Sequence, residues 1–161
     1  HEENNLHAII ISKRKKFSLC VKQIDDFLPY INNYETVEYI EPRIFLNRQP
    51  ELPGVINRWL KNENPYGKVL AINTIIRCFN HESYYRNWME TILEIKTDDL
   101  YLNKKRAQFF SSALINFEDF FLPYLTSGAL DRWTHNMTLQ LSANSKGVKS
   151  EKKEMYISLR R

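Results

Sequence analysis

Apolar residues recur every three to four positions along most of this 161-residue chain, and this spacing favours a fold of packed helices. The clearest stretch runs from Phe17 to Ile31, with apolar side chains at positions 17, 20, 21, 24, 27, 28 and 31. The chain has only 4 Gly and 6 Pro, about half the share typical of globular proteins. A β-rich fold of this length needs more turn residues. We therefore expect an all-α protein.

Capping and turn residues divide the chain into the expected helices. We place them at residues 2–12, 17–31, 64–79, 82–95, 98–116, 117–125, 131–143 and 150–159, with shorter helical segments around Pro42 and Pro53. Helix pairs begin near Pro65, Asp98 and Asp131, about 33 residues apart, as in helical solenoids. The sequence therefore predicts one HEAT-like solenoid domain over residues 1–161.

Several classes of function are disfavoured by the residues present. No apolar run approaches the ~18–20 residues of a membrane span. The four Gly are isolated, so no phosphate-binding loop and no nucleotide cofactor are expected. The four His and two Cys show no metal-ligand spacing, and we expect Cys20 and Cys78 to be buried thiols. We expect no metal, no cofactor and a cytoplasmic protein without a membrane partner.

Three clusters of basic residues point to a possible partner. They are Lys13–Lys16, Lys104–Arg106 and the segment from Lys146 to Arg161, within a chain of formal net charge +4 and pI about 9.0. Cations repeated on one face of a solenoid would follow a phosphate backbone. The alternative is that each cluster is simply the solvated face of a helix.

Tyr34 and Glu38 stand four residues apart, which places them on the same face if this segment is helical. An aromatic ring beside a carboxylate is suited to a cationic ligand. A solvated surface pair remains the alternative for two residues at this spacing.

The C-terminal segment resembles a known family. The residues that carry the likeness are Leu130-Asp131-Arg132-Trp133-Thr134-His135-Asn136, Leu139-Gln140, Ser145, Val148 and Leu159-Arg160-Arg161. They resemble the C-terminal signature of the DNA alkylation repair proteins, the HEAT-like alkylpurine DNA glycosylases of the AlkD type. Weaker likenesses at residues 31–45, 64–79 and 101–114 extend it over essentially the whole chain. The resemblance implies that two or three further helices precede His1 in the native protein.

This resemblance implies a specific activity. Proteins of the family grip duplex DNA on a basic surface and excise N3- and N7-alkylated purines without a metal or cofactor. An Asp carboxylate stabilises the developing sugar cation, which is electrostatic catalysis. Aromatic rings pack against the deoxyribose, and an Arg holds a phosphate.

Carried over residue by residue, the family pattern selects a set of candidate positions. Tyr34 takes the place of the first Trp, and Glu38 takes the place of the catalytic Asp. Val69 stands at the Arg position beside Lys68, and Gln108 stands at the second Trp position. The candidate catalytic residues are Glu38 and Tyr34. The candidate DNA-binding residues are Lys68, Lys104, Lys105, Arg106, Gln108, Arg132, Lys146 and Lys149.

Three hypotheses follow for the function. The first is a glycosylase for alkylated purines, with Glu38 as the electrostatic carboxylate. The second is a catalytically weak or inactive DNA-binding relative, because Val69 and Gln108 lack the family's groups. The third is a protein-binding helical scaffold. Whether the chain is an enzyme is therefore left open, and the expected partner is damaged duplex DNA, bound by a monomer in a bacterial-type cytoplasm at the nucleoid.

Overall fold

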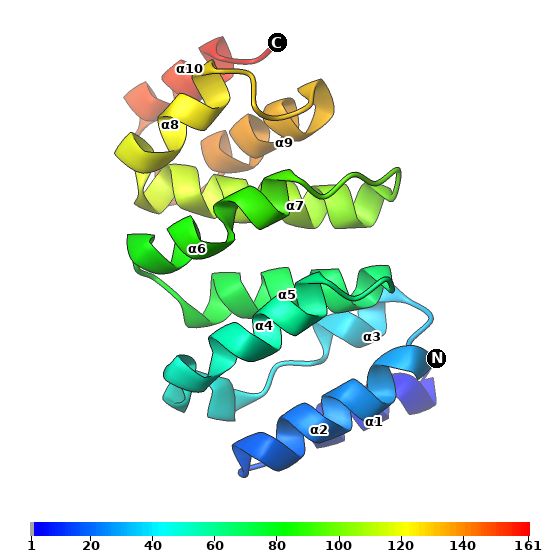
Figure 1. Ribbon diagram of the computed structural model, residues 1–161. Coiled ribbons are helices and arrows are strands. Elements are labelled where there is room, and N and C mark those ends of the chain that lie inside the picture. Colours follow the sequence, from blue (N-terminus) through cyan, green and yellow to red (C-terminus); the bar gives the residue numbers. More distant parts are fainter. Residues whose placement is uncertain (1) are drawn as a thin grey trace. The chain divides into compact units, whose positions relative to one another are not determined.

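The computed structural model describes residues 2–161, and these residues form helices and connecting turns with no β-strand among them (Figure 1). The all-α class expected from the sequence is thereby confirmed. The chain divides into two compact units, unit 1 (His1–Phe79) and unit 2 (Asn80–Arg161). The HEAT-like solenoid and the single domain over 1–161 stay predictions.

The described residues of unit 1 form five α-helices and three short 3-10 helices. The α-helices are α1 (Glu2–Ser12), α2 (Phe17–Phe27), α3 (Tyr34–Glu38), α4 (Leu52–Leu60) and α5 (Pro65–Cys78), and the 3-10 helices are Leu28–Tyr30, Arg43–Asn47 and Gln49–Glu51. Helix α1 packs against α2 and α3, while α5 packs against α3 and α4. Helix α3 is therefore held between the first and last helices of the unit.

Helix α1 has the bounds expected from the sequence, and its apolar residues do not all lie on its buried side. Leu6 and Ile10 are 58% and 46% exposed, whereas Ala8 and Ile11 are buried. The inward face is set by the contacts of α1 with α2 and α3. Helical spacing alone did not distinguish the two faces, because apolar residues occur on both.

Helix α3 is short because residues at both of its ends limit it. At its start, the side-chain Oδ1 of Asn33 accepts a hydrogen bond from the backbone N–H of Thr36 at 2.8 Å. Beyond its end at Glu38, Pro42 lacks a backbone N–H and restricts the residue before it. Short helical segments are thus present on both sides of Pro42, as expected: α3 ends before it, and a 3-10 helix, Arg43–Asn47, follows it.

Helix α5 begins as the sequence predicts. The side chain of Asn64 accepts a hydrogen bond from the N–H of Tyr66 at 2.9 Å, and Pro65 occupies the first turn. Val69, Ile72 and Ile75 are buried in the core of unit 1.

Unit 2 also contains five α-helices among the described residues. They are α6 (Glu82–Leu93), α7 (Leu100–Asn116), α8 (Glu118–Thr126), α9 (Arg132–Ala143) and α10 (Ser150–Ser158). The long helix α7 contacts α6, α8 and α9, and α10 packs on α9. Helix α7 starts slightly later than predicted, because Asp99, and not Thr97 or Asp98, accepts the capping hydrogen bond from Leu102 at 2.9 Å.

Candidate functional site

Unit 1 contains a cavity of about 820 Å³ that is bordered by the end of α1, the loop after it, the end of α3 and the following 3-10 helix. Its walls combine cationic, carboxylate, apolar and amide side chains. The lining residues are Ile9, Ser12, Lys13, Arg14, Lys15, Glu38, Tyr39, Glu41, Arg43, Ile44 and Asn47. This cavity therefore brings one candidate catalytic residue, Glu38, together with the first basic cluster.

Hydrogen bonds at Ser12 fix the two sides of the cavity to each other. The Ser12 hydroxyl lies 2.8 Å from the Ala8 carbonyl and 3.0 Å from the Tyr39 carbonyl, and it accepts a bond from the Glu41 N–H at 2.9 Å. The last turn of α1 is thus tied to the chain just after α3. The basic loop that follows Ser12 is held beside the end of α3 by these contacts.

Glu38 is the last residue of α3 and is only partly exposed. Its Oε1 accepts a hydrogen bond from the side-chain amide of Asn73 on α5, at a distance of 3.3 Å. This contact restrains the carboxylate at the cavity wall, because α5 is itself packed against α3. A carboxylate held in this way can stabilise a positive charge that develops in the cavity.

Tyr34 lies at the other end of α3 and is not a lining residue of the cavity. Its ring packs edge-on against Tyr66 of α5, with 4.8 Å between the ring centroids and 61° between the planes. This contact anchors α3 on α5. The aromatic residue among those that line the cavity is Tyr39, which directly follows Glu38.

The face of α5 beneath α3 carries Val69, Asn73 and Arg77 at four-residue intervals. Val69 is 0% exposed and belongs to the core. Arg77 Nη1 lies 3.5 Å from the Ile40 carbonyl and 3.8 Å from the Glu41 carboxylate. The position that resembles the family's Arg is thus a buried apolar one.

Lys68, the candidate DNA-binding residue next to Val69, donates a hydrogen bond from its ammonium to the carbonyl of Asn62. Its side chain therefore extends back toward the turn that precedes α5.

Cationic side chains outnumber carboxylates around the cavity. Lys13, Arg14, Lys15 and Arg43 line it, against the carboxylates of Glu38 and Glu41. Arg14 is oriented by a hydrogen bond from its Nε to Gln23 of α2 at 2.8 Å. An excess of positive charge around a concave surface raises the local concentration of anionic ligands.

In unit 2, the four candidate residues on α7 are placed very differently from one another. Lys104 is exposed and Gln108 is partly buried, whereas Lys105 is only 8% exposed, with its Nζ 5.4 Å from the ring centre of Tyr101. The Arg106 side chain is 5% exposed and extends into the interior of the unit. Of these three basic residues, Lys104 is exposed, while Lys105 and Arg106 are buried.

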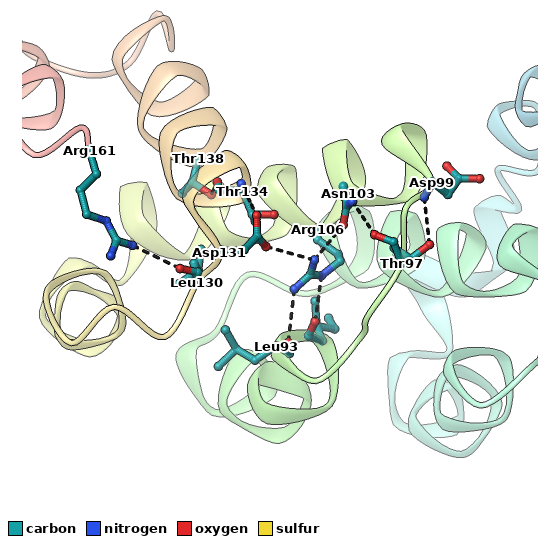
Figure 2. Close-up of polar contacts among 11 residues, drawn as sticks. Leu93, Thr97, Asp99, Asn103, Arg106, Leu130, Asp131, Thr134, Thr138 and Arg161 are labelled. Atoms are coloured by element: carbon teal, nitrogen blue, oxygen red, sulfur yellow. Dashed lines mark hydrogen bonds and ion pairs between the residues drawn. The ribbon is translucent and has the colours of Figure 1, made fainter.

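Arg106 joins the end of α6 to the start of α9, as Figure 2 shows. Its guanidinium donates to the carbonyls of Ile92 and Leu93 at 3.1 and 3.2 Å and to Asn103 at 2.8 Å. An ion pair at 3.7 Å links it to Asp131. The donors of this buried cation are thus directed to its own chain, where they satisfy the last carbonyls of α6.

Asp131 is both the partner of Arg106 and the N-cap of α9. Its Oδ1 accepts a hydrogen bond from the N–H of Thr134 at 2.9 Å. Partial burial raises the pKa of Asp131, but the bonds from Thr134 and the charge of Arg106 outweigh this effect and hold the pKa below its usual value. The carboxylate is therefore part of the structural framework of unit 2.

The segment that resembles the family signature holds the C-terminal residues on α9. Asn136 exchanges two hydrogen bonds with the backbone of Arg161, and Arg132 Nε donates to the Arg161 carbonyl at 3.1 Å. His135 bonds through Nε2 to the Leu159 carbonyl and through Nδ1 to the Arg161 guanidinium, both at 2.9 Å. Both contacts are satisfied together by a neutral imidazole that carries its proton on Nε2. Much of the signature thus has a structural explanation.

The two remaining candidate cations, Lys146 and Lys149, are exposed between α9 and α10. Lys149 is the residue directly before α10, and its side chain forms no capping bond. Both ammonium groups lie at the surface of unit 2.

Sequence reasoning missed Ser12, Tyr39, Arg43 and Asn73. Ser12, Tyr39 and Arg43 line the cavity and Asn73 contacts Glu38 from α5, and these placements depend on segments of unit 1 that are distant in the sequence. Two partial signals were available: Tyr39 directly follows Glu38, and Arg43 follows a proline that ends the preceding segment. Nothing in the local pattern marks Asn73, because its role depends on its contact with α3.

Other site types find no support in the part of the chain that the structure describes. Between residues 2 and 161, no three His, Cys, Asp or Glu side chains gather as a metal site requires. No helix in that range has both the length and the apolar character needed to cross a membrane. Cys20 and Cys78 are free and buried, as expected, and burial raises the pKa of Cys20 to about 11.

Comparison with known proteins gives no assignment. No family model, no curated protein and no solved structure matches this chain.

Proposed function

We propose that this chain binds duplex DNA and excises alkylated purines, with Glu38 as the carboxylate that stabilises the positively charged sugar. The observation that carries the proposal is the position of Glu38 in the wall of a cavity that cationic side chains also line. Such a cavity combines attraction for the phosphate backbone with a negative charge for the reacting sugar. The resemblance to the alkylation repair proteins supports the same combination.

The chemistry requires little more than electrostatic stabilisation. An N3- or N7-alkylated purine carries a positive charge, so its glycosidic bond breaks with the purine as a neutral leaving group and leaves a cationic sugar. The Glu38 carboxylate, restrained by the Asn73 amide, favours that cation and accepts a hydrogen bond from the attacking water. Water then forms the new bond to the sugar carbon and releases a proton to solvent.

Tyr39 supplies the ring that faces the sugar in this proposal. It lines the cavity beside Glu38, whereas Tyr34, the residue selected from the sequence, packs against Tyr66. We therefore assign Tyr34 to the support of α3. Lys104, Lys146 and Lys149 keep their proposed contacts with DNA because they are exposed, while Lys105 and Arg106 are assigned to the interior of unit 2.

A second candidate is a DNA-binding relative without excision activity. It is favoured by Val69, which is fully buried at the position that resembles the family's phosphate-binding Arg. An excision site that lacks this cation has less power to fix the damaged nucleotide against the carboxylate. In this case duplex binding persists and base release is absent.

Release of 7-methylguanine from a methylated duplex separates the two candidates. We expect release by the protein to fall by about 10²–10³-fold in Glu38→Gln, because the charge is removed at nearly constant shape. Glu35→Gln, on the exposed side of α3, is the matched control and should retain the full rate. If the unaltered protein binds the duplex but releases no base, the second candidate is favoured. If it neither binds the duplex nor releases a base, the protein-binding scaffold is the hypothesis that remains.

A further inference from the structure

The cations that line the cavity come from two segments that are fixed to each other. Lys13, Arg14 and Lys15 lie in the loop between α1 and α2, and Arg43 begins the 3-10 helix after Pro42. The hydrogen bonds of Ser12 to the Tyr39 carbonyl and the Glu41 N–H join these segments close to both sets of cations. Their relative position is therefore built into unit 1.

The orientation of Arg14 also suits an anionic ligand. Its Nε donates to Gln23, so this nitrogen and the plane of the guanidinium are held from the α2 side. The two terminal nitrogens remain as a pair of parallel donors, the arrangement that binds a phosphate through two oxygens. Lys13 and Lys15 add point charges on either side of Arg14 in the sequence.

We propose that Lys13, Arg14, Lys15 and Arg43 form the phosphate-binding rim of the cavity and hold the DNA backbone next to Glu38. This inference rests on the proposed function and names the groups that bind the partner at that site. The rim provides the phosphate contact that Val69, buried in the core, does not make. Its ligand is the backbone of a duplex, in which successive phosphates are spaced regularly enough to meet several cations at once.

Two features favour a polyanion over a small anion as the ligand. The rim draws four cations from two segments, while the cavity also includes the carboxylates of Glu38 and Glu41. A small anion placed centrally would face these carboxylates at close range. A backbone that follows the rim keeps its phosphates near the cations and presents the sugar to Glu38.

The test measures the binding of a fluorescent, undamaged 16-base-pair duplex by anisotropy over a range of chloride concentrations. Single Gln substitutions at Lys13, Arg14, Lys15 and Arg43 are compared with the unaltered protein. Each substitution should weaken duplex binding by about 3- to 10-fold near 0.1 M salt. Each should also make the fall of the logarithm of the association constant with the logarithm of the salt concentration shallower, by about 1 unit of slope. Far-UV circular dichroism melts verify that each variant is folded.

Lys16 offers a matched control within the same basic run. It is exposed and precedes α2, but it does not line the cavity and makes no side-chain capping bond. Lys16→Gln should change affinity by less than about 2-fold, and Lys61→Gln, on the exposed end of α4, should behave in the same way. Equal losses of duplex affinity in Lys16→Gln and Arg43→Gln would overturn the assignment of the rim as the binding site, because the overall positive charge would then explain the binding.

A second comparison separates a backbone site from a small-anion site. Inorganic phosphate and chloride are matched for ionic strength in the same binding assay. Because the rim binds phosphate groups, phosphate should displace the duplex more readily than chloride, but only at concentrations on the order of millimolar, since one small anion meets few of the four cations. Displacement by micromolar phosphate would show a site for a small anion and would overturn the assignment to DNA. Rim variants that weaken duplex binding support the rim even if no base is released. The binding assay therefore tests the rim separately from the proposed excision activity, which the base-release assay tests.

Discussion

Units 1 and 2 use their polar side chains in contrasting ways. In unit 2, Arg106, Asp131 and Asn136 direct their hydrogen bonds to helix ends and to the C-terminal backbone of the same unit. In unit 1, Glu38 and several cations line a cavity of about 820 Å³. The first arrangement satisfies groups that folding would otherwise leave buried and unpaired, while the second leaves charge accessible to a ligand.

The contrast teaches that the most distinctive motif need not mark the chemistry. The residues from Leu130 to Asn136 carry the strongest resemblance to a family, yet their contacts cap α9 and hold Arg161. Such a motif is constrained by the fold. The weaker pattern around Tyr34 and Glu38 leads to the cavity, because Glu38 ends a helix beside it.

The largest expected effect is on the stability of unit 2. Arg106→Met keeps much of the side-chain length but leaves the carbonyls of Ile92 and Leu93 without their guanidinium donor and Asp131 without its cation. We expect a loss of about 2–4 kcal/mol in the free energy of unfolding, measured by urea denaturation. Duplex binding by the variant that remains folded should persist.

Lys104→Met is the matched control for that substitution, because Lys104 lies on the same helix but is exposed. Its effect on the free energy of unfolding should stay within about 0.5 kcal/mol. Glu38→Gln should be similarly neutral for stability while it reduces base release. A cost below about 1 kcal/mol for Arg106→Met would break the contrast between the units.

A smaller effect is expected in the pH dependence of stability. The pKa of Asp131 is lowered in the folded protein, so the stability that its charge contributes is present above the unfolded pKa of about 3.9. That contribution is lost as the pH falls through the lower folded value. Asp131→Asn keeps a capping oxygen, so it should be less stable than the unaltered protein at pH 7 by under about 1 kcal/mol.

Urea denaturation at a series of pH values checks this expectation. The difference between Asp131→Asn and the unaltered protein should narrow as the pH is lowered below about 4. A difference that is constant down to pH 2 would show that the carboxylate charge contributes nothing beyond the cap. In that case the ion pair with Arg106 would have no role in holding α9.

The sequence was sufficient to predict most of the helices, for identifiable physical reasons. Asn64 and Asp131 are strong N-caps, and both begin helices where expected. The start of α7 was predicted slightly early, because Thr97 and Asp98 are good capping residues too, and only the structure shows Asp99 in that role. The buried side of α1 could not be predicted from the sequence, because its apolar residues lie on more than one side of the helix.

The candidate site was predictable only in part. Glu38 was found because a carboxylate four residues after an aromatic residue is a local pattern. Arg106 was grouped with exposed cations, since sequence gives no measure of burial for one residue in a basic run. Arg43 and Asn73 were missed, because their relation to Glu38 arises from the packing of α3, α5 and the 3-10 helix.

Hydrogen–deuterium exchange with and without a short duplex tests most directly whether the cavity of unit 1 meets the ligand. We expect the strongest slowing of amide exchange at residues 9–15 and 38–47, which contain the cavity wall, and little change at residues 132–143. Slowing confined to unit 2, or no change anywhere at saturating duplex, would contradict the assignment of the ligand site to unit 1.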